Sequence, residues 1–209
     1  SLGIGGKGIA LTVDGQGRMT EADPFVGGAI SVAEACRNLS CVGAEPIAIT
    51  DCLNFGNPKK LDIYYQLEEC IKGIAHACEI LGIPVVSGNV SLFNESNGKA
   101  IHPTPIIGAL GVISNVENRV SMEWKNPEDV IVLLGSTLEE AQPDSLAGSE
   151  VQNLLTNKIA GKPSINLFLE KSLQGLVRGF TERNLINSAH DCSKGGIAVT
   201  LAESSLLSN

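Results

Sequence analysis

Two polar segments, 50–58 (TDCLNFGNP) and 87–96 (SGNVSLFNES), each follow a short apolar run that predicts a β-strand. Asp51 lies at the start of the first segment, and Gly88 and Asn89 lie at the start of the second. Because the carboxyl ends of neighbouring parallel strands lie side by side, we expect Asp51 and Asn89 to come together. Residues of these types also form ordinary turns, so a structural role is the alternative.

These residue types suit a site for a nucleotide and a metal ion. Carboxylate and carboxamide oxygens are ligands that Mg²⁺ accepts together with phosphate oxygens. Gly88 has no Cβ, so a phosphate or a base could approach its backbone closely. Ser91 and Asn94, in the same segment, could donate hydrogen bonds to an anion.

A third candidate segment is 189–204 (AHDCSKGGIAVTLAES). Its glycine pair predicts a helix start with free N–H groups for an anion, and Asp191 is either a helix-cap residue or a metal ligand. His190 and Cys192 do not predict a catalytic pair, because residues this close in an extended segment do not generally meet side chain to side chain. The N-terminal GIGGKG (3–8) matches a dinucleotide-binding pattern, but it precedes a strand instead of following one.

The elements that must position these residues follow from hydrophobic periodicity and turn residues. One parallel strand–helix–strand unit is predicted over 46–87, with the helix at 61–81 and a stop at Gly82. A strand at 106–113 is continuously apolar and is expected to be buried on both faces. The composition changes near residue 122, which predicts two domains, 1–122 and 123–209. Further predicted elements are strands at 9–14, 46–50, 84–87 and 131–135, helices at 28–40 and 166–183, a loop at 135–150 and a helix from about 196.

Composition excludes several classes of function. The chain has 209 residues, 43% of them hydrophobic, and a net charge of −8. It offers no basic surface for nucleic acid or an anionic membrane, and no apolar run of about 18 residues that would span a bilayer. Six cysteines without zinc-type spacing are expected to be reduced and mostly buried, as in cytoplasmic proteins.

Three segments together resemble one enzyme family: 27–58, 82–96 and 189–204. They are similar to phosphoribosylformylglycinamidine synthase, subunit II, of purine biosynthesis. The resemblance implies an α/β fold: an aminoimidazole ribonucleotide synthetase-like (PurM-like) N-terminal-type domain, with a mixed sheet and flanking helices, and then a truncated C-terminal-type domain. The chain would correspond to part of the second half of a longer, internally duplicated protein.

The resemblance also implies a reaction and partners. The family converts formylglycinamide ribonucleotide, ATP and ammonia to formylglycinamidine ribonucleotide, ADP and phosphate. The ammonia comes from glutamine on a separate glutaminase subunit, and a small accessory subunit assists. ATP and Mg²⁺ are therefore the expected cofactors.

Matching the motifs residue by residue implies roles for five residues. Asp51 and Gly88 would contact ATP, Asn89 would be a magnesium ligand, and Ser91 would contact the substrate. Asp191 matches an aspartate that helps to hold a metal-bound nucleotide at an auxiliary site of larger relatives. Lys194 departs from the acidic residue that is usual in that motif.

No catalytic residue is expected in this chain, because the family's catalytic histidines lie in the other half of the enzyme. The chain alone is therefore expected to be inactive. In the family the N-terminal-type domains pair through their sheets into a closed barrel, so the unpaired sheet edge of this chain predicts a homodimer that rebuilds such a barrel. The alternative is a non-catalytic module that binds a nucleotide for structural reasons or docks other subunits. A relative with a different phosphoryl-transfer substrate is a third possibility, and it would require a departure from ITDCLNFGNP that the sequence lacks.

Overall fold

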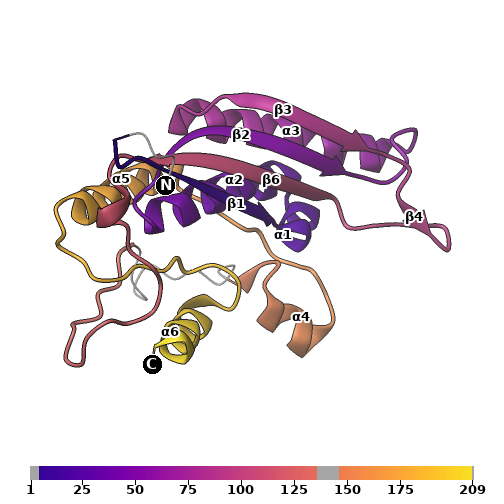
Figure 1. The fold of residues 1–209 in the computed structure, drawn as a ribbon. Helices are drawn as coiled ribbons and strands as arrows, with labels where there is room; N and C mark the ends of the chain where they lie inside the picture. The colour runs from indigo at the N-terminus through magenta and orange to yellow at the C-terminus, as the bar shows by residue number, and fades with distance from the viewer. Residues whose placement is uncertain (1–4, 136–145, 209) are drawn as a thin grey trace.

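A four-stranded mixed sheet with helices on one face forms the first part of the chain in the computed structural model, which describes residues 5–135 and 146–208 (Figure 1). The strand order is β1–β6–β2–β3, where β2 and β3 are parallel and the other pairs are antiparallel. This arrangement confirms the predicted α/β class. The sheet strands are β1 (Gly8–Gly15), β2 (Glu45–Asn54), β3 (Val85–Ser91) and β6 (Thr104–Ile113).

Three helices accompany the sheet, and shorter elements connect the strands. The helices are α1 (Gly17–Ala22), α2 (Pro24–Cys41) and α3 (Leu61–Leu81). A small hairpin of β4 (Glu95–Ser96) and β5 (Lys99–Ala100) follows β3, and the short 3-10 helix η1 (Val116–Asn118) follows β6.

Helix α3 has the bounds that the sequence predicts. Its apolar stripe buries Ile63, Cys70 and Ile74. It ends at Gly82, which adopts a left-handed φ of 79° and donates its N–H to the carbonyl of Cys78 at 2.8 Å. Glycine adopts this conformation without a steric penalty, so the predicted stop is confirmed.

Helices α2 and α3 cross at backbone contact distance. A Cβ added to Gly73 would lie 1.9 Å from the carbonyl oxygen of Phe25, and one added to Gly28 would lie 2.5 Å from that of Cys70. Helix α2 begins four residues before the predicted position 28, because Asp23 accepts from the N–H of Val26 at 3.0 Å and caps the helix.

Two predicted strand ends are wrong. Strand β2 continues to Asn54 instead of ending at residue 50, and β3 continues through Gly88 to Ser91. Residues of β2 from Thr50 onward pair with β3 on one side and with β6 on the other. The two ladders satisfy the backbone groups of this polar segment, so it remains a strand.

The prediction that the strand at 106–113 is buried on both faces is also wrong. In β6, buried residues alternate with half-buried ones, because the helices cover only one face of the sheet. On the open face, Ile9, Leu11 and Val13 of β1 are 48%, 76% and 70% exposed. The uncovered face is therefore apolar along its β1 side.

In the described residues after η1, the regular elements are helices, joined by long irregular segments. They are α4 (Glu150–Thr156), which the sequence did not predict, α5 (Leu167–Glu182) and α6 (Gly196–Leu207). Helices α5 and α6 confirm the two predicted helices. Residues 131–135 form no strand, because they pair with no other described segment. The predicted loop at 135–150 lies largely outside the described residues, and the domain boundary near 122 stays a prediction.

Helix α5 packs against α2 and joins the two parts of the chain. Gln174 is buried and donates to the carbonyl of Ala33 at 3.2 Å, and Arg178 donates to the hydroxyl of Ser40 at 2.9 Å. Within the described ranges, no helix is both long enough and apolar enough to cross a membrane.

Candidate functional site

The register of β2 and β3 decides how the predicted site residues face. Asp51 lies opposite Gly88, and Cys52 lies opposite Asn89. Side chains alternate between the two faces of a sheet, so those of Asp51 and Asn89 point to opposite faces. The prediction that they come together holds for their backbones only.

Asp51 lies on the face that the helices cover. Its neighbours of the same parity, Ile49 and Leu53, are buried in the core, and burial raises the pKa of the Asp51 carboxyl. A Cβ added to Gly88 would lie 2.4 Å from Oδ1 of Asp51. The space that Gly88 leaves open is therefore filled by this carboxylate.

Asn89 lies on the open face, where neighbouring side chains orient its amide. Its Nδ2 lies 3.7 Å from Sγ of Cys52, and Nδ2 of Asn54 approaches the same sulfur at 3.7 Å. Asn54 also donates to the carbonyl of Thr104 at 3.2 Å, which ties β2 to β6. With its amide N–H directed at sulfur, Asn89 presents a carboxamide oxygen, which is the kind of donor that Mg²⁺ accepts.

Ser91 is the last residue of β3, and Asn94 holds its side chain. Nδ2 of Asn94 lies 3.1 Å from Oγ of Ser91 and 2.9 Å from the Ser91 carbonyl oxygen. The sequence marked Asn94 as a donor for an anion, but in the structure its amide group is occupied by β2 and β3. Asn54 was not singled out, because only its place at the end of two ladders gives it a role.

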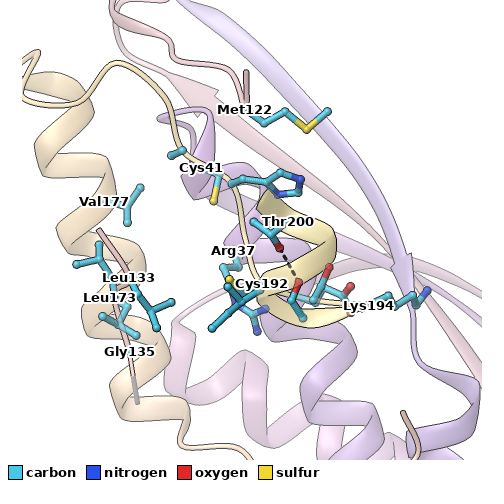
Figure 2. A pocket seen from close by; sticks show the side chains of 18 of the residues that line it. Arg37, Cys41, Met122, Leu133, Gly135, Leu173, Val177, Cys192, Lys194 and Thr200 are labelled. Carbon is cyan, nitrogen blue, oxygen red and sulfur yellow. Dashed lines mark hydrogen bonds between the residues drawn. The ribbon is translucent and has the colours of Figure 1, made fainter. Parts of the chain in front are cut away.

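Asp191 lies elsewhere, beside a cleft of about 1880 Å³ whose lining comes from both predicted domains. Figure 2 shows Arg37 of α2 near Cys192 and Thr200, with Cys41 of α2 and Lys194 further out along the same cleft. Leu173 and Val177 of α5 make the cleft apolar on that side. Asp51, Asn89 and Ser91 do not line this cleft, so the predicted residues fall into two separate regions.

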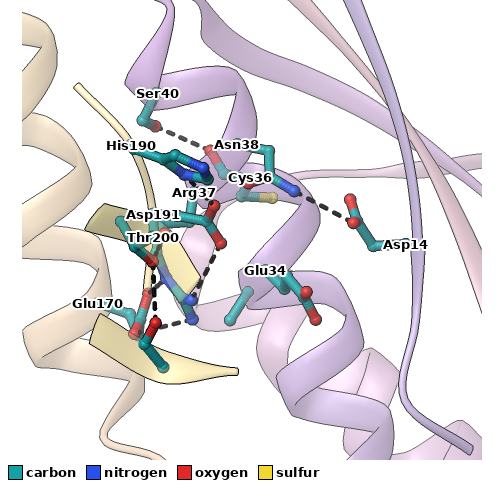
Figure 3. Close-up of polar contacts among 12 residues, drawn as sticks. Asp14, Glu34, Cys36, Arg37, Asn38, Ser40, Glu170, His190, Asp191 and Thr200 are labelled. Atoms are coloured by element: carbon teal, nitrogen blue, oxygen red, sulfur yellow. Dashed lines mark hydrogen bonds and ion pairs between the residues drawn. The ribbon is translucent and has the colours of Figure 1, made fainter. Parts of the chain in front are cut away.

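Arg37 is the centre of the charges at this cleft (Figure 3). Its guanidinium donates to both carboxylate oxygens of Glu170, at 3.1 and 3.2 Å, and lies 3.7 Å from Oδ2 of Asp191. Sequence reasoning missed Arg37 and Glu170, because they lie 133 positions apart and no local motif connects them.

Asp191 is 7% exposed, and its two carboxylate oxygens differ. Oδ1 lies 3.2 Å from Nδ1 of His190, whereas Oδ2 is buried without a hydrogen-bond partner in the described structure. His190 also contacts Glu203 of α6 at 3.0 Å through Nε2. Oδ2 of Asp191 therefore fits a role as one of the ligands of a cation. The guanidinium of Arg37, 3.7 Å away, already supplies positive charge to the same oxygen.

Glu34 is the second buried carboxylate at the cleft, 4% exposed. Burial raises its pKa, whereas a hydrogen bond from Gln16 and the positive charge of Lys194 lower it. Lys194, which departs from the family motif, therefore supplies positive charge toward a buried carboxylate.

The glycine pair before α6 begins the helix as the sequence predicts. Gly195 is the N-cap residue, with a left-handed φ of 87°, and no side chain caps the helix. A Cβ there would lie 2.2 Å from a methyl carbon of Val199. Over residues 5–135 and 146–208, no cluster of three or more His, Cys, Asp or Glu side chains could hold a metal ion by itself.

Comparisons with known proteins match both parts of the chain. The model described as "AIR synthase related protein, N-terminal domain" matches residues 2–113, and the corresponding C-terminal domain model matches residues 126–209. The phosphoribosylformylglycinamidine synthase subunit PurL of Caldanaerobacter subterraneus is 51% identical over 201 residues, which is 96% of this chain and 27% of that protein. The chain spans about a quarter of the length of the curated relatives it matches.

Two solved structures are similar to the chain. "T. maritima PurL complexed with ATP" is 26% identical, with a TM-score of 0.62, over 95% of this chain and 29% of that one. "Structure of PurLQS from Thermotoga maritima" is 38% identical, with a TM-score of 0.51, over 55% of this chain and 19% of that one. These similarities confirm the predicted PurM-like fold.

Proposed function

Because this chain belongs to the family of AIR synthase related proteins, we propose that it is part of a phosphoribosylformylglycinamidine synthase. The complete ligase would convert formylglycinamide ribonucleotide, ATP and ammonia from glutamine to formylglycinamidine ribonucleotide, ADP and phosphate. The observation that carries the proposal is the 51% identity to a PurL subunit across 96% of the chain.

The site that we propose for the nucleotide lies at the carboxyl ends of β2 and β3. On the open face, Asn89 would supply one oxygen to Mg²⁺, the phosphates would supply others, and Ser91 would contact the substrate. Asp51 and Gly88, which pair with each other one position before Cys52 and Asn89, would contact ATP. Support comes from the carboxamide oxygen of Asn89, which has no hydrogen-bond donor among the described residues, and from the burial that raises the pKa of Asp51.

Asp191 would bind a metal ion at a second site. Its buried Oδ2, which lacks a hydrogen-bond partner in the described structure, supports this assignment. Magnesium would there have to share the carboxylate with Arg37, 3.7 Å away.

Partners are part of the proposal. The structure named PurLQS is of a complex of that protein, and by analogy a glutaminase subunit and a small accessory subunit would bind the complete enzyme. The chain alone would form a homodimer through the open face of its sheet, where Leu11 is 76% exposed. A monomer in light scattering at high concentration would contradict the homodimer.

A second candidate function is a non-catalytic nucleotide-binding or subunit-docking module. The observation that favours it is that Asp51 and Asn89 face opposite sides of the sheet.

Formation of the amidine by this chain alone, from formylglycinamide ribonucleotide, ATP and ammonium, would refute our expectation that it is inactive.

Thermal unfolding with and without Mg-ATP and Mg-ADP tests the nucleotide site. Ligand at 100 times its dissociation constant should stabilise the chain by about 2.7 kcal/mol. The shift should vanish in Asn89→Ala and persist in Asn97→Gly, a control in the exposed β4–β5 turn, where φ is 51°. If Mg-ATP gives no shift in the parent chain, the nucleotide site is not contained in it.

A further inference from the structure

The side chain of Asn94 connects the segment after β3 to Phe55, the residue that follows β2. Its Nδ2 donates to the carbonyl of Phe55 at 3.1 Å and to that of Ser91 at 2.9 Å. The backbone completes the connection, because Phe55 N–H donates to the Ser91 carbonyl at 3.0 Å and Asn94 N–H donates to the Phe55 carbonyl at 3.1 Å. Asn94 therefore joins the ends of the two strands that carry the proposed site.

The same amide group contacts the Ser91 hydroxyl. Oγ of Ser91 donates to Oδ1 of Asn94 at 3.3 Å, and Nδ2 of Asn94 approaches Oγ at 3.1 Å. A serine hydroxyl has one proton to donate and two lone pairs to accept with. The two N–H groups of Asn94 are directed at the Phe55 and Ser91 carbonyl oxygens, so the bond that fixes the hydroxyl is the one that Ser91 donates to Oδ1. The lone pairs of the Ser91 hydroxyl therefore stay available.

The backbone between these two residues is held in an uncommon conformation. Phe93 has a φ of 62°, in the left-handed region that bulky residues rarely adopt. Its N–H donates to the carbonyl of Gly56 at 2.9 Å, and Ile101 N–H donates to the carbonyl of Asn94 at 3.0 Å. Such a conformation persists where surrounding contacts fix it, and here it returns the Asn94 side chain to the end of β3.

We propose that Asn94 is a positioning residue that fixes the Ser91 hydroxyl as a hydrogen-bond acceptor for the substrate. The substrate group at Ser91 would then be an N–H or an O–H, such as the amide N–H or a ribose hydroxyl of formylglycinamide ribonucleotide. This inference rests on the proposed function, which assigns Ser91 to the substrate. It adds that Asn94 orients Ser91, and that in the hydrogen bond between Ser91 and the substrate the substrate is the donor.

Three variants of the chain test the proposal. Asn94→Ala removes both polar contacts that the described structure gives to the Ser91 hydroxyl. Asn94→Asp keeps an oxygen that accepts the Ser91 proton but loses the N–H donors. Asn97→Asp adds the same charge three positions away, in the exposed turn where a left-handed backbone tolerates aspartate. Thermal unfolding first establishes which variants are folded.

Three-bond ¹⁵N–¹Hβ couplings report the rotamer of Ser91 without any ligand. We expect one rotamer in the parent chain, in Asn94→Asp and in Asn97→Asp, and averaging over several rotamers in Asn94→Ala. A single Ser91 rotamer in Asn94→Ala would overturn the proposal. If Asn94→Ala does not fold, averaging in Asn94→Asp, where the accepting oxygen remains, would also overturn it.

Titration with formylglycinamide ribonucleotide then tests the link to binding. The dissociation constant should rise about tenfold in Asn94→Ala, the loss of one net hydrogen bond, and stay within about threefold in the two aspartate variants. If the parent chain shows no response to this ligand, the proposed substrate role of Ser91 fails, while the couplings still decide whether Asn94 positions it. If the Ser91 resonances shift on titration and Asn94→Ala binds the ligand as tightly as the parent chain does, the inference is overturned and the proposed function stands.

Discussion

The crossing of α2 and α3 predicts that one added methyl group destabilises the chain. In Gly73→Ala, the new Cβ would lie 1.9 Å from the Phe25 carbonyl oxygen, 2.7 Å from its carbonyl carbon and 3.0 Å from its Cα. All three are backbone atoms, so no side chain can rotate away. An ordinary contact begins near 3.4 Å, so the two helices would have to separate by about 1.5 Å.

Two opposing terms set the size of the effect. Overpacking of this kind costs about 1–3 kcal/mol or more, and alanine in place of glycine inside a helix returns about 1 kcal/mol. We expect a net loss of about 2 kcal/mol, which lowers the unfolding midpoint by roughly 4–8 °C in a chain of this size.

The matched control is Gly175→Ala in α5, where a Cβ would meet nothing within 4 Å. The same substitution there should raise the midpoint by roughly 2–4 °C. Thermal melts followed by circular dichroism should therefore show midpoint shifts of opposite sign for the two variants. Equal shifts, or a Gly73→Ala midpoint at or above that of the parent, would refute the close crossing of the helices.

Two further predictions concern charged residues. Because burial raises the pKa of Asp51, ionising it costs stability as the pH rises from the ordinary pKa of an aspartate through the raised one. The melting temperature of Asp51→Asn should therefore be higher than that of the parent at about pH 7 and equal to it at about pH 3. A difference in melting temperature that stays constant across several pH values would contradict this prediction. Arg37→Met leaves Glu170 and Asp191 without their shared cation and should lower the free energy of unfolding, measured in urea, by about 3 kcal/mol. Arg183→Met, at an exposed position, is the control and should lower it by less than about 0.5 kcal/mol. Similar losses in both variants would show that Arg37 does not neutralise these carboxylates.

Local patterns predicted the four longest described helices, α2, α3, α5 and α6, but not the short helices α1 and α4. The apolar stripe of α3 and its glycine stop depend only on neighbouring residues, and both appear at the predicted positions. The glycine pair before α6 is another local signal. The apolar run at 131–135 also resembles a strand, but a strand requires a partner, and it pairs with nothing in the described ranges.

The candidate site could be predicted only in part, because its geometry depends on register. Topology correctly placed the backbones of Asp51 and Asn89 on adjacent strands. The faces to which they point depend on which residues pair, and the register of β2 against β3 shifts between Ile49 and Thr50. A shift of one position reverses the face of every side chain, and periodicity does not reveal it. The contact between Arg37 and Asp191 likewise requires the packing of distant segments.

The cysteines differ in burial, so a thiol reagent can distinguish regions of the molecule. Burial raises the pKa of Cys36 and Cys70 to about 12, so these thiols react slowly near neutral pH. Cys52 is half-buried on the open face beside Asn89, and Cys192 is exposed at the cleft. A thiol reagent therefore samples two regions of the molecule separately. A ligand that shields Cys52 alone occupies the open face, and one that shields Cys192 alone occupies the cleft, so the rates of alkylation locate a ligand without a crystal.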